Sequence, residues 1–302
     1  MKNNILIISG SGFIGSHLAY ELLKENNVTV LSKYNHKFFS DIPSAKYIKE
    51  DWKSVDYKKL LSRNNYHKVI LLGWSDHPRS SNENLLKSFK DNVVVNMNII
   101  DNIIKYSESD IYFSSSYGAL PYINKRYNEQ STSGYAAGKM AIENYLNTYS
   151  KIYSRNIVSL RISNPYGLYQ DPMGSQGVIP IFINLALKKQ IIQMFKGCEL
   201  EKDYIHIKDA SKQISHQLSK NNIDNFSISE IKSGFLLSAI DIVSHINIHI
   251  PLLDLIPEKY SNEVAHLSDA IRNSINTKDN SHVKIFSDTI LKIKNWINDI
   301  NN

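Results

Sequence analysis

The chain contains a single cysteine, Cys198, so no disulfide can form within it. Disulfides mark oxidising compartments, and their absence favours a reducing one. The segment MKNNILIISGSG holds only four apolar residues before Ser9, too few for the core of a signal peptide. The longest apolar-looking stretch, residues 235–253, is interrupted by Asp241, His245, Asn247 and His249, which makes it too polar to span a bilayer. We therefore expect a cytoplasmic protein with no membrane partner.

Clustered positive charge is also absent. The net charge is +6 and the pI is near 9.0, yet no run of four or more basic residues occurs. A nucleic-acid interface needs such clustering, so this balance favours small anionic ligands instead of nucleic acid. The hydrophobic and charged fractions, 42% and 21%, are those of an ordinary globular protein and exclude disorder.

Short apolar runs alternate with helical patterns through the first half of the chain. Runs of strand length occupy residues 5–8, 28–31, 69–72, 111–113 and 157–160. Helical spacing occupies residues 13–24, 56–62, 85–106 and 135–149. This alternation predicts right-handed βαβ crossovers, and hence an α/β fold with a Rossmann-like, doubly wound parallel sheet.

The rhythm changes after residue 162. NPYGLYQDPMGSQG, residues 164–177, has the composition of a functional loop. A helix is expected at 179–187, strands at QIIQMF and KDYIHI, and a last helix near 288–297. We predict a dinucleotide-binding domain over residues 1–162, to which 203–220 return, and a smaller mixed α/β substrate-binding lobe over most of 163–302.

GSGFIG, residues 10–15, directly follows the first strand and opens the first helix. Gly10 permits a tight turn, Gly12 lets the backbone approach a pyrophosphate, and Gly15 allows close packing of helix on sheet. Amides at the helix start would donate to the phosphates. The pattern predicts a bound dinucleotide.

The second strand ends at Ser32 and Lys33, where a carboxylate would normally hold the ribose 2′-hydroxyl of NAD. A cation there suits the 2′-phosphate of NADP. Lys33 can equally be a solvated loop residue beside bound NAD. The cofactor is therefore NADP or NAD, with a slight preference for NADP, and no metal ligand is expected.

GYAAGKMAIEN, residues 134–144, places Tyr135 and Lys139 one helical turn apart. An adjacent ammonium stabilises a phenolate and lowers the pKa of a tyrosine. Such a tyrosine can take a proton from a sugar hydroxyl while hydride moves to a nicotinamide. The strand before this helix ends in FSSSYG, whose hydroxyls can bond the reacting oxygen or simply cap the strand exit.

Together these motifs resemble the extended short-chain dehydrogenase/reductase family, in its NAD(P)-dependent nucleotide-sugar epimerase/dehydratase branch, which is UDP-galactose 4-epimerase-like. KEDW, KDNVVVN, LRISNPYG and EKDYIHIKD match further segments of that branch. The resemblance implies cofactor contacts from residues 10–15 and from the segments that follow, and substrate contacts from the polar residues of the second half. The cofactor set is Gly10, Gly12, Phe13, Ile14, Gly15, Ser32, Lys33, Asp51, Trp52, Leu72, Gly73, Asn92, Ser114, Tyr135 and Lys139, and the substrate set is Ser116, Asn164, Lys202 and Tyr204.

The resemblance implies reversible oxidation at C4 of a nucleotide-diphosphate sugar. Tyr135 would be the base and Lys139 would lower its pKa. Ser115 would bond the reacting oxygen, with Ser116 the close alternative. Such an enzyme would serve cell-surface polysaccharide sugar biosynthesis and form a homodimer through helices near 85–106 and 135–149.

Three departures from the family pattern leave choices open. Ser9 replaces its first glycine, and Lys202 replaces an arginine whose planar fork grips phosphate in two places. The loop between the serines and Tyr135 is shorter than is usual in the family, which leaves the choice between Ser115 and Ser116 open. The branch favours a 4-epimerase, whereas the missing acid at Ser32 favours an NADPH-dependent 4-keto-sugar reductase. A 4,6-dehydratase is disfavoured because Ser116 and Tyr117 stand where it carries Asp-Glu, and a non-catalytic dinucleotide-binding protein is a remote alternative.

Overall fold

The computed structural model describes residues 2–37, 42, 44–117, 133–194, 197–220, 225–274 and 281–301. The chain forms two compact units. Unit 1 comprises Met1–Ser163 and Ile207–Lys232, and unit 2 comprises Asn164–His206 and Ser233–Asn302. The segment that returns to unit 1 thus runs over 207–232, later than the expected 203–220, because the strand at 202–206 pairs within unit 2.

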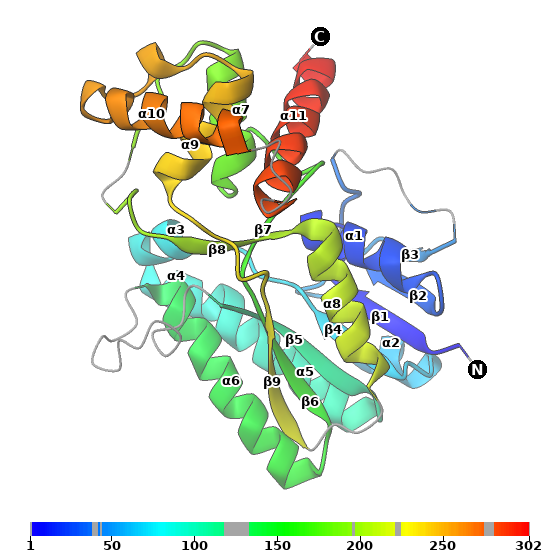
Figure 1. Ribbon diagram of the computed structural model, residues 1–302. Helices are drawn as coiled ribbons and strands as arrows, with labels where there is room; N and C mark the ends of the chain where they lie inside the picture. Colours follow the sequence, from blue (N-terminus) through cyan, green and yellow to red (C-terminus); the bar gives the residue numbers. More distant parts are fainter. Residues whose placement is uncertain are drawn as a thin grey trace. The chain divides into compact units, whose positions relative to one another are not determined.

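Unit 1 is built on a parallel sheet that has seven strands in the described part of the chain, in the order β3-β2-β1-β4-β5-β6-β9 (Figure 1). Every strand pair in it is parallel. The order reverses at β1 and β4, as in a doubly wound fold. The strands are β1 (Asn4–Ile8), β2 (Asn27–Leu31), β3 (Lys46–Ile48), β4 (Lys68–Leu71), β5 (Asp110–Ser116), β6 (Ile157–Ile162) and β9 (Phe226–Ile231).

Helices cover both faces of this sheet, which is why its central strands are apolar throughout. Alternate strand residues such as Leu6 and Phe113 pack with Ile100 and Ile142 on one face. The opposite face carries two helices that pack on each other. The helices of unit 1 are α1 (Phe13–Leu22), α2 (Tyr57–Arg63), α3 (Pro78–Glu83), α4 (Leu85–Ser88), η1 (Phe89–Val94), α5 (Val95–Tyr106), α6 (Gly134–Tyr153) and α8 (Ile207–Ser219), of which α1 and α8 form that second layer.

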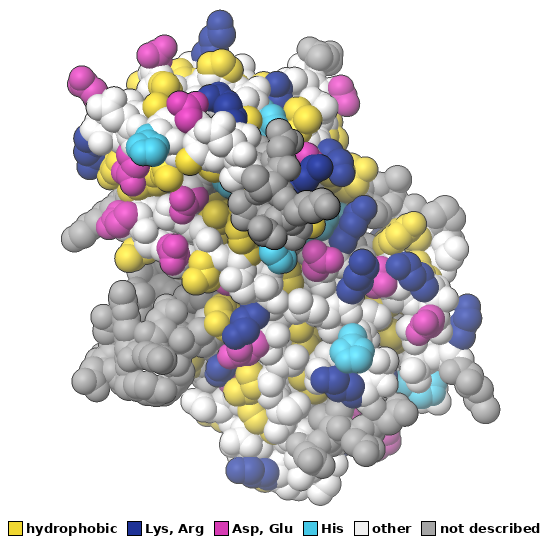
Figure 2. All heavy atoms as spheres, in the orientation of Figure 1, with side chains coloured by type: hydrophobic (Ala, Val, Ile, Leu, Met, Phe, Trp, Pro, Cys, Tyr) yellow, Lys and Arg dark blue, Asp and Glu magenta, His cyan; other side chains and the backbone are white. Residues whose placement is uncertain are grey.

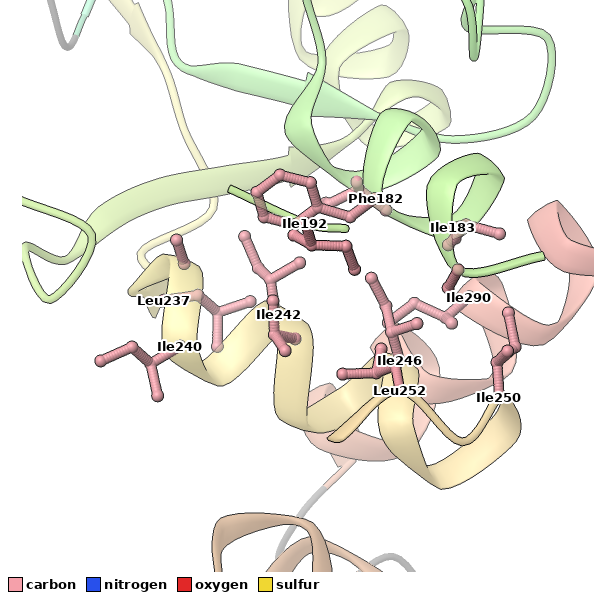
Figure 3. Packing of buried hydrophobic residues seen from close by; sticks show 14 of the residues in the cluster. Phe182, Ile183, Ile192, Leu237, Ile240, Ile242, Ile246, Ile250, Leu252 and Ile290 are labelled. Carbon is pink, nitrogen blue, oxygen red and sulfur yellow. The ribbon is translucent and has the colours of Figure 1, made fainter. Parts of the chain in front are cut away.

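Unit 2 combines a small mixed sheet with a helical cluster. Strands β7 (Asn164–Tyr166) and β8 (Lys202–His206) are parallel, and β10 (Leu236–Leu237) is antiparallel to β8. Figure 3 shows apolar side chains of α7 (Val178–Leu187), α9 (Ala239–His249) and α11 (Ser281–Asn301) converging on one core that contains Phe182, Ile246 and Ile290. The turn η3 (Leu253–Leu255) and helix α10 (Glu258–Ser274) complete the unit.

One expectation about an element is corrected. Residues 190–194 of QIIQMF form no strand in the described chain, and Ile192 instead packs as a core residue that donates its amide to Leu255. The stretch 235–253, expected to be too polar for a membrane, contains β10 and α9. Within the described residues, no helix combines the length and apolarity needed to cross a bilayer.

Candidate active site

The turn between β1 and α1 is shaped by one left-handed residue and two close approaches. Ser9 has a φ of 60°, the left-handed region that favours glycine. A Cβ on Gly10 would lie 2.9 Å from Ile7 Cγ2, and a Cβ on Gly15 would collide with the Gly10 carbonyl. Gly10 and Gly15 are therefore needed by the turn itself.

Gly12 serves a different purpose, because a Cβ there would meet no atom within 4 Å in the described structure. It starts α1 with extended backbone, and no side chain of the described residues caps this helix or adds an acid to its first turn. The Ser11 Oγ beside it is buried without a hydrogen-bond partner. Uncapped amides and an orphaned hydroxyl fit a pyrophosphate, so the turn suits the dinucleotide that the sequence predicts. Phe13 and Ile14 open the helix.

Ser32 and Lys33 follow β2 as expected. The Ser32 amide donates to the Ile48 carbonyl at 3.0 Å, which joins the exit of β2 to β3. Lys33 Nζ lies 3.8 Å from Asp51 Oδ2, and both side chains are largely exposed. Two residues of the predicted cofactor set, Lys33 and Asp51, therefore form a surface ion pair.

Tyr135 stands in the first turn of α6, at the carboxyl end of β5. Burial raises the pKa of its phenol, and a hydrogen bond with Ser116 lowers it. We expected Lys139 to lower this pKa, and its Nζ lies 5.6 Å from the centroid of the Tyr135 ring, but burial is the largest influence on the pKa of the phenol. The structure therefore joins Tyr135 to Ser116, and the tuning of Tyr135 by Lys139 stays a prediction.

Ser115 points elsewhere, because successive strand residues face opposite sides of a sheet. Its side chain lies toward the carboxylate of Glu143 on α6 and lowers the pKa of that group, but the buried Ser115 Oγ has no hydrogen-bond partner of normal geometry in the described chain. Glu143 accepts from Ser159 Oγ at 2.7 Å and from Arg161 Nε and Nη2 at 3.1 and 2.7 Å. Of the two serines left open by the sequence, Ser116 is the one that meets the phenol, and the catalytic role predicted for Ser115 stays a prediction.

Lys139 is buried, with 2% of its surface exposed. Its Nζ donates to the Ser114 carbonyl at 2.6 Å. The rings of Trp74, Phe113 and Tyr135 surround the ammonium, with centroids 3.9, 4.8 and 5.6 Å away. Burial lowers the pKa of Lys139 to about 7. Ser114 thus contributes its backbone to the site.

Asn92, expected at the cofactor, is fully buried in the π-helical segment η1. Its amide oxygen accepts from the amide and hydroxyl of Ser75, and its nitrogen donates to Asp76 Oδ2 and the Ser88 carbonyl. Three of these four hydrogen bonds hold the loop after β4. Asn92 therefore supports this loop from the protein interior.

Leu72 and Gly73 lie in that loop. The Leu72 amide donates to the Ile8 carbonyl, which joins the loop to β1. A Cβ on Gly73 would lie 2.6 Å from the ring of Trp52, so glycine lets Trp52 pack against this loop. Both residues therefore lie at the carboxyl edge of the sheet, as predicted.

Four residues around Tyr135 and Lys139 were not predicted from the sequence, namely Trp74, Asp76, Glu143 and Arg161. Glu143 carried a signal, because it lies one turn beyond Lys139 on the same helix. For Asp76 the sequence offered only a weak signal, namely an acidic residue shortly after the end of a strand.

The remaining predicted residues belong to unit 2. Asn164 and Tyr204 are direct partners across β7 and β8, and Lys202 begins β8 with an exposed side chain. Asn164 Nδ2 donates to the Asp203 carbonyl at 2.8 Å, and burial raises the pKa of Tyr204 to about 12. The small sheet thus brings these three residues together within unit 2.

The chain is similar to known proteins of one family. Residues 5–229 match the model of the NAD dependent epimerase/dehydratase family. A provisionally named UDP-glucose 4-epimerase of Methanocaldococcus jannaschii is 31% identical over 251 residues, 80% of this chain and 81% of that protein. A dTDP-4-dehydro-6-deoxyglucose reductase of Escherichia coli is 32% identical over 233 residues, 69% and 70% of the two chains.

Solved structures have the same fold. A UDP-glucose 4-epimerase of Thermotoga maritima with UDP-glucose superposes with a TM-score of 0.70 at 23% identity, over 81% of each chain. A UDP-glucose 4-epimerase of Thermus thermophilus in complex with NAD gives a TM-score of 0.67 at 25% identity, over 81% of this chain and 82% of that one. The expected doubly wound fold and its resemblance are therefore confirmed.

Proposed function

This chain belongs to the NAD-dependent epimerase/dehydratase family, and we propose that it epimerises a nucleotide-diphosphate sugar at C4. The observation that carries the proposal is the contact of Tyr135 with Ser116 beside the buried ammonium of Lys139. A relative that is named as a UDP-glucose 4-epimerase and matches 80% of the chain supports the same activity.

The protein groups divide the work of oxidation. Tyr135 takes the proton of the C4 hydroxyl, and Ser116 donates to the oxygen whose charge changes. The charge of Lys139, held at the Ser114 carbonyl, stabilises the phenolate form of Tyr135, which is the form that accepts this proton. Bound NAD or NADP would supply a hydride acceptor that later returns the hydride. When the bound 4-keto sugar rotates and presents its other face before the hydride returns, the product is the C4 epimer.

NAD is the simpler cofactor, because the family is NAD-dependent. NADP remains the alternative on one observation, the exposed Lys33 at the end of β2. Its charge is opposed by Asp51, which weakens the preference for NADP that the sequence alone gave.

The second candidate function is an NADPH-dependent 4-keto-sugar reductase. It is favoured by the missing acid at Ser32 and by the reductase relative from Escherichia coli. The same Tyr135 would then donate its proton to the oxygen of a 4-keto sugar. Either activity would supply sugars for cell-surface polysaccharides.

One assay separates the two functions. Purified protein is incubated with UDP-, GDP- and dTDP-sugars in the presence of NAD or NADP, and separately with 4-keto sugars in the presence of NADPH, while NADPH absorbance and product composition are followed. Interconversion of C4 epimers without net change in NADPH supports the epimerase. Oxidation of one NADPH per 4-keto sugar supports the reductase, and no change with any substrate contradicts both.

We also propose that two copies of unit 1 pair through the helices that follow β4 and β5. These helices expose an apolar set that a second copy would cover, comprising Leu85, Leu86, Phe89, Val94, Tyr145, Ile152 and Tyr153. On the face in Figure 2, by contrast, basic and acidic side chains are interspersed. Sedimentation of the wild type and of Leu86→Glu tests this pairing, which predicts a dimer and a monomer respectively.

A further inference from the structure

Asp76 lies in the loop between β4 and α3 and is held at both carboxylate oxygens. Trp74 Nε1 donates to Oδ1 at 2.7 Å, and Asn92 Nδ2 donates to Oδ2 at 2.9 Å. Two fixed donors leave the carboxylate little rotational freedom. We refer to Trp74, Ser75, Asp76 and Asn92 as the Asp76 brace.

The brace is rigid because Asn92 is itself anchored. The π-helical turn of η1 carries Asn92 to the loop, where it bonds Ser75 and the Ser88 carbonyl as well as Asp76. Such π turns inside α-helices are costly in regular helix geometry and are frequent at functional sites. The turn thus brings a buried amide under the carboxylate.

The brace reaches the catalytic pair through Trp74. The ring of Trp74 lies 3.9 Å from Lys139 Nζ and meets the ring of Tyr135 edge-on, with centroids 5.5 Å apart. A Cβ on Gly138 would lie 3.1 Å from the Trp74 ring, so glycine at this position of α6 permits the approach. The loop after β4, the π-helical turn of η1 and Gly138 of α6 therefore together place Trp74 against Lys139.

We propose that Asp76 is a positioning residue for the Tyr135–Lys139 pair, whose fixed carboxylate keeps the buried ammonium of Lys139 protonated and holds Trp74 over it. The part of this proposal that concerns turnover rests on the proposed function. The part that concerns the charge of Lys139 does not, because it can be measured without any substrate.

Two carboxylates face Lys139 in the described structure, and they differ in strength. Asp76 and Glu143 both raise the pKa of Lys139 against the stronger effect of burial, and Asp76 is the larger of the two. Glu143 is gripped at both oxygens by Arg161, whose positive charge offsets it. Asp76 also raises the pKa of Tyr135. The other groups around the ammonium are the Ser114 carbonyl and the aromatic rings.

The direct test is the titration of Lys139 itself. Protein labelled with ¹³C at lysine Cε is titrated by NMR, and the Lys139 signal is assigned by its loss in Lys139→Met. In Asp76→Asn the pKa of Lys139 should fall by on the order of one further unit, because an opposing charge has been removed. The control Asp101→Asn, which removes a surface partner of Lys105, should leave it unchanged. An unshifted Lys139 in Asp76→Asn overturns the proposal.

Folding is controlled with a second charge-removing variant, Asp76→Ser, whose hydroxyl can still accept from Asn92. Whichever variant keeps the wild-type melting temperature carries the test. Loss of folding in both would show that the carboxylate is needed for structure alone, which also overturns the proposal.

A kinetic arm follows if the wild type turns over a nucleotide sugar. Because Asp76 raises the pKa of both Tyr135 and Lys139, Asp76→Asn should move both limbs of the pH profile to lower pH. A lower kcat with unmoved limbs would indicate a merely structural role and contradict the proposal. If no sugar is turned over, the proposed function fails, while the NMR titration still decides the role of Asp76.

Discussion

The ammonium of Lys139 lies closer to the ring of Trp74 than to that of Tyr135, at 3.9 Å against 5.6 Å from the centroids. A cation over an indole face is attracted by the ring. With the Ser114 carbonyl at 2.6 Å, protein groups alone fix the position of this lysine. The ammonium of Lys139 is therefore held in a fixed position, where its charge can stabilise the ionised phenol of Tyr135.

Tyr135→Phe should reduce kcat by roughly 10³-fold, the range expected for a lost acid–base group. It should leave cofactor affinity unchanged, because the ring still packs edge-on against Trp74. Tyr145→Phe on the exposed side of the same helix is the matched control and should be neutral. Turnover rates and cofactor titration of both variants check this, and an active Tyr135→Phe would remove the assigned base.

The two serines at the end of β5 should differ. Ser116→Ala should lower kcat by about 10²-fold, because it removes the hydroxyl that meets the phenol. Ser115→Ala should leave kcat near the wild-type value and change stability little, since the buried Ser115 Oγ has no hydrogen-bond partner in the described chain. Steady-state kinetics and thermal melting of the two variants check both expectations. The reverse pattern would restore Ser115 as the catalytic hydroxyl.

Ser115 and Ser116 show what could not be predicted from the sequence. The alternation of side chains along a strand implies that neighbouring serines face opposite ways, but not which one faces the helix. The register became visible only with the helix in place, when Glu143 lay beside Ser115. Residues 118–132, whose shortness left the choice open, lie outside the described chain.

Gly12→Ala should fold normally and bind the dinucleotide about tenfold more weakly. Its backbone has a φ of −81°, which alanine adopts, and its Cβ position is open. The added methyl would occupy the space where the pyrophosphate approaches the helix amides. Melting curves and calorimetric titration with the cofactor check this. Gly15→Ala is the contrasting variant and should lose stability, whereas unaltered binding by Gly12→Ala would place the phosphates elsewhere.

Lys33→Asp should shift the ratio of NADP to NAD affinity toward NAD by about tenfold, because a carboxylate repels a 2′-phosphate and accepts from a 2′-hydroxyl. The variant also breaks the ion pair with Asp51. Lys53→Asp, which changes a charge near the same carboxylate, is the control. An unchanged ratio in Lys33→Asp would show that Lys33 does not meet the 2′-phosphate.

The fold was largely predictable because its strands and helices have clear periodicity. Strand β9 was not recognised, because its alternating FSISEI pattern comes after the regular alternation of strands and helices has ended. This strand pairs with β6 and forms the edge of the sheet. Trp74 and Asp76 could not be assigned for another reason. Their role depends on a π-helical turn and on Gly138, whose close approach to the Trp74 ring becomes visible only in the folded chain.

The central claim is that hydride, and not a proton, leaves C4 and returns to the same sugar. The most direct measurement follows a nucleotide sugar that carries deuterium at C4 through conversion in water, with product analysis by NMR. The account predicts that the C4 epimer forms with its deuterium retained at C4. Replacement of that deuterium by solvent hydrogen would show proton abstraction at C4 and contradict the account.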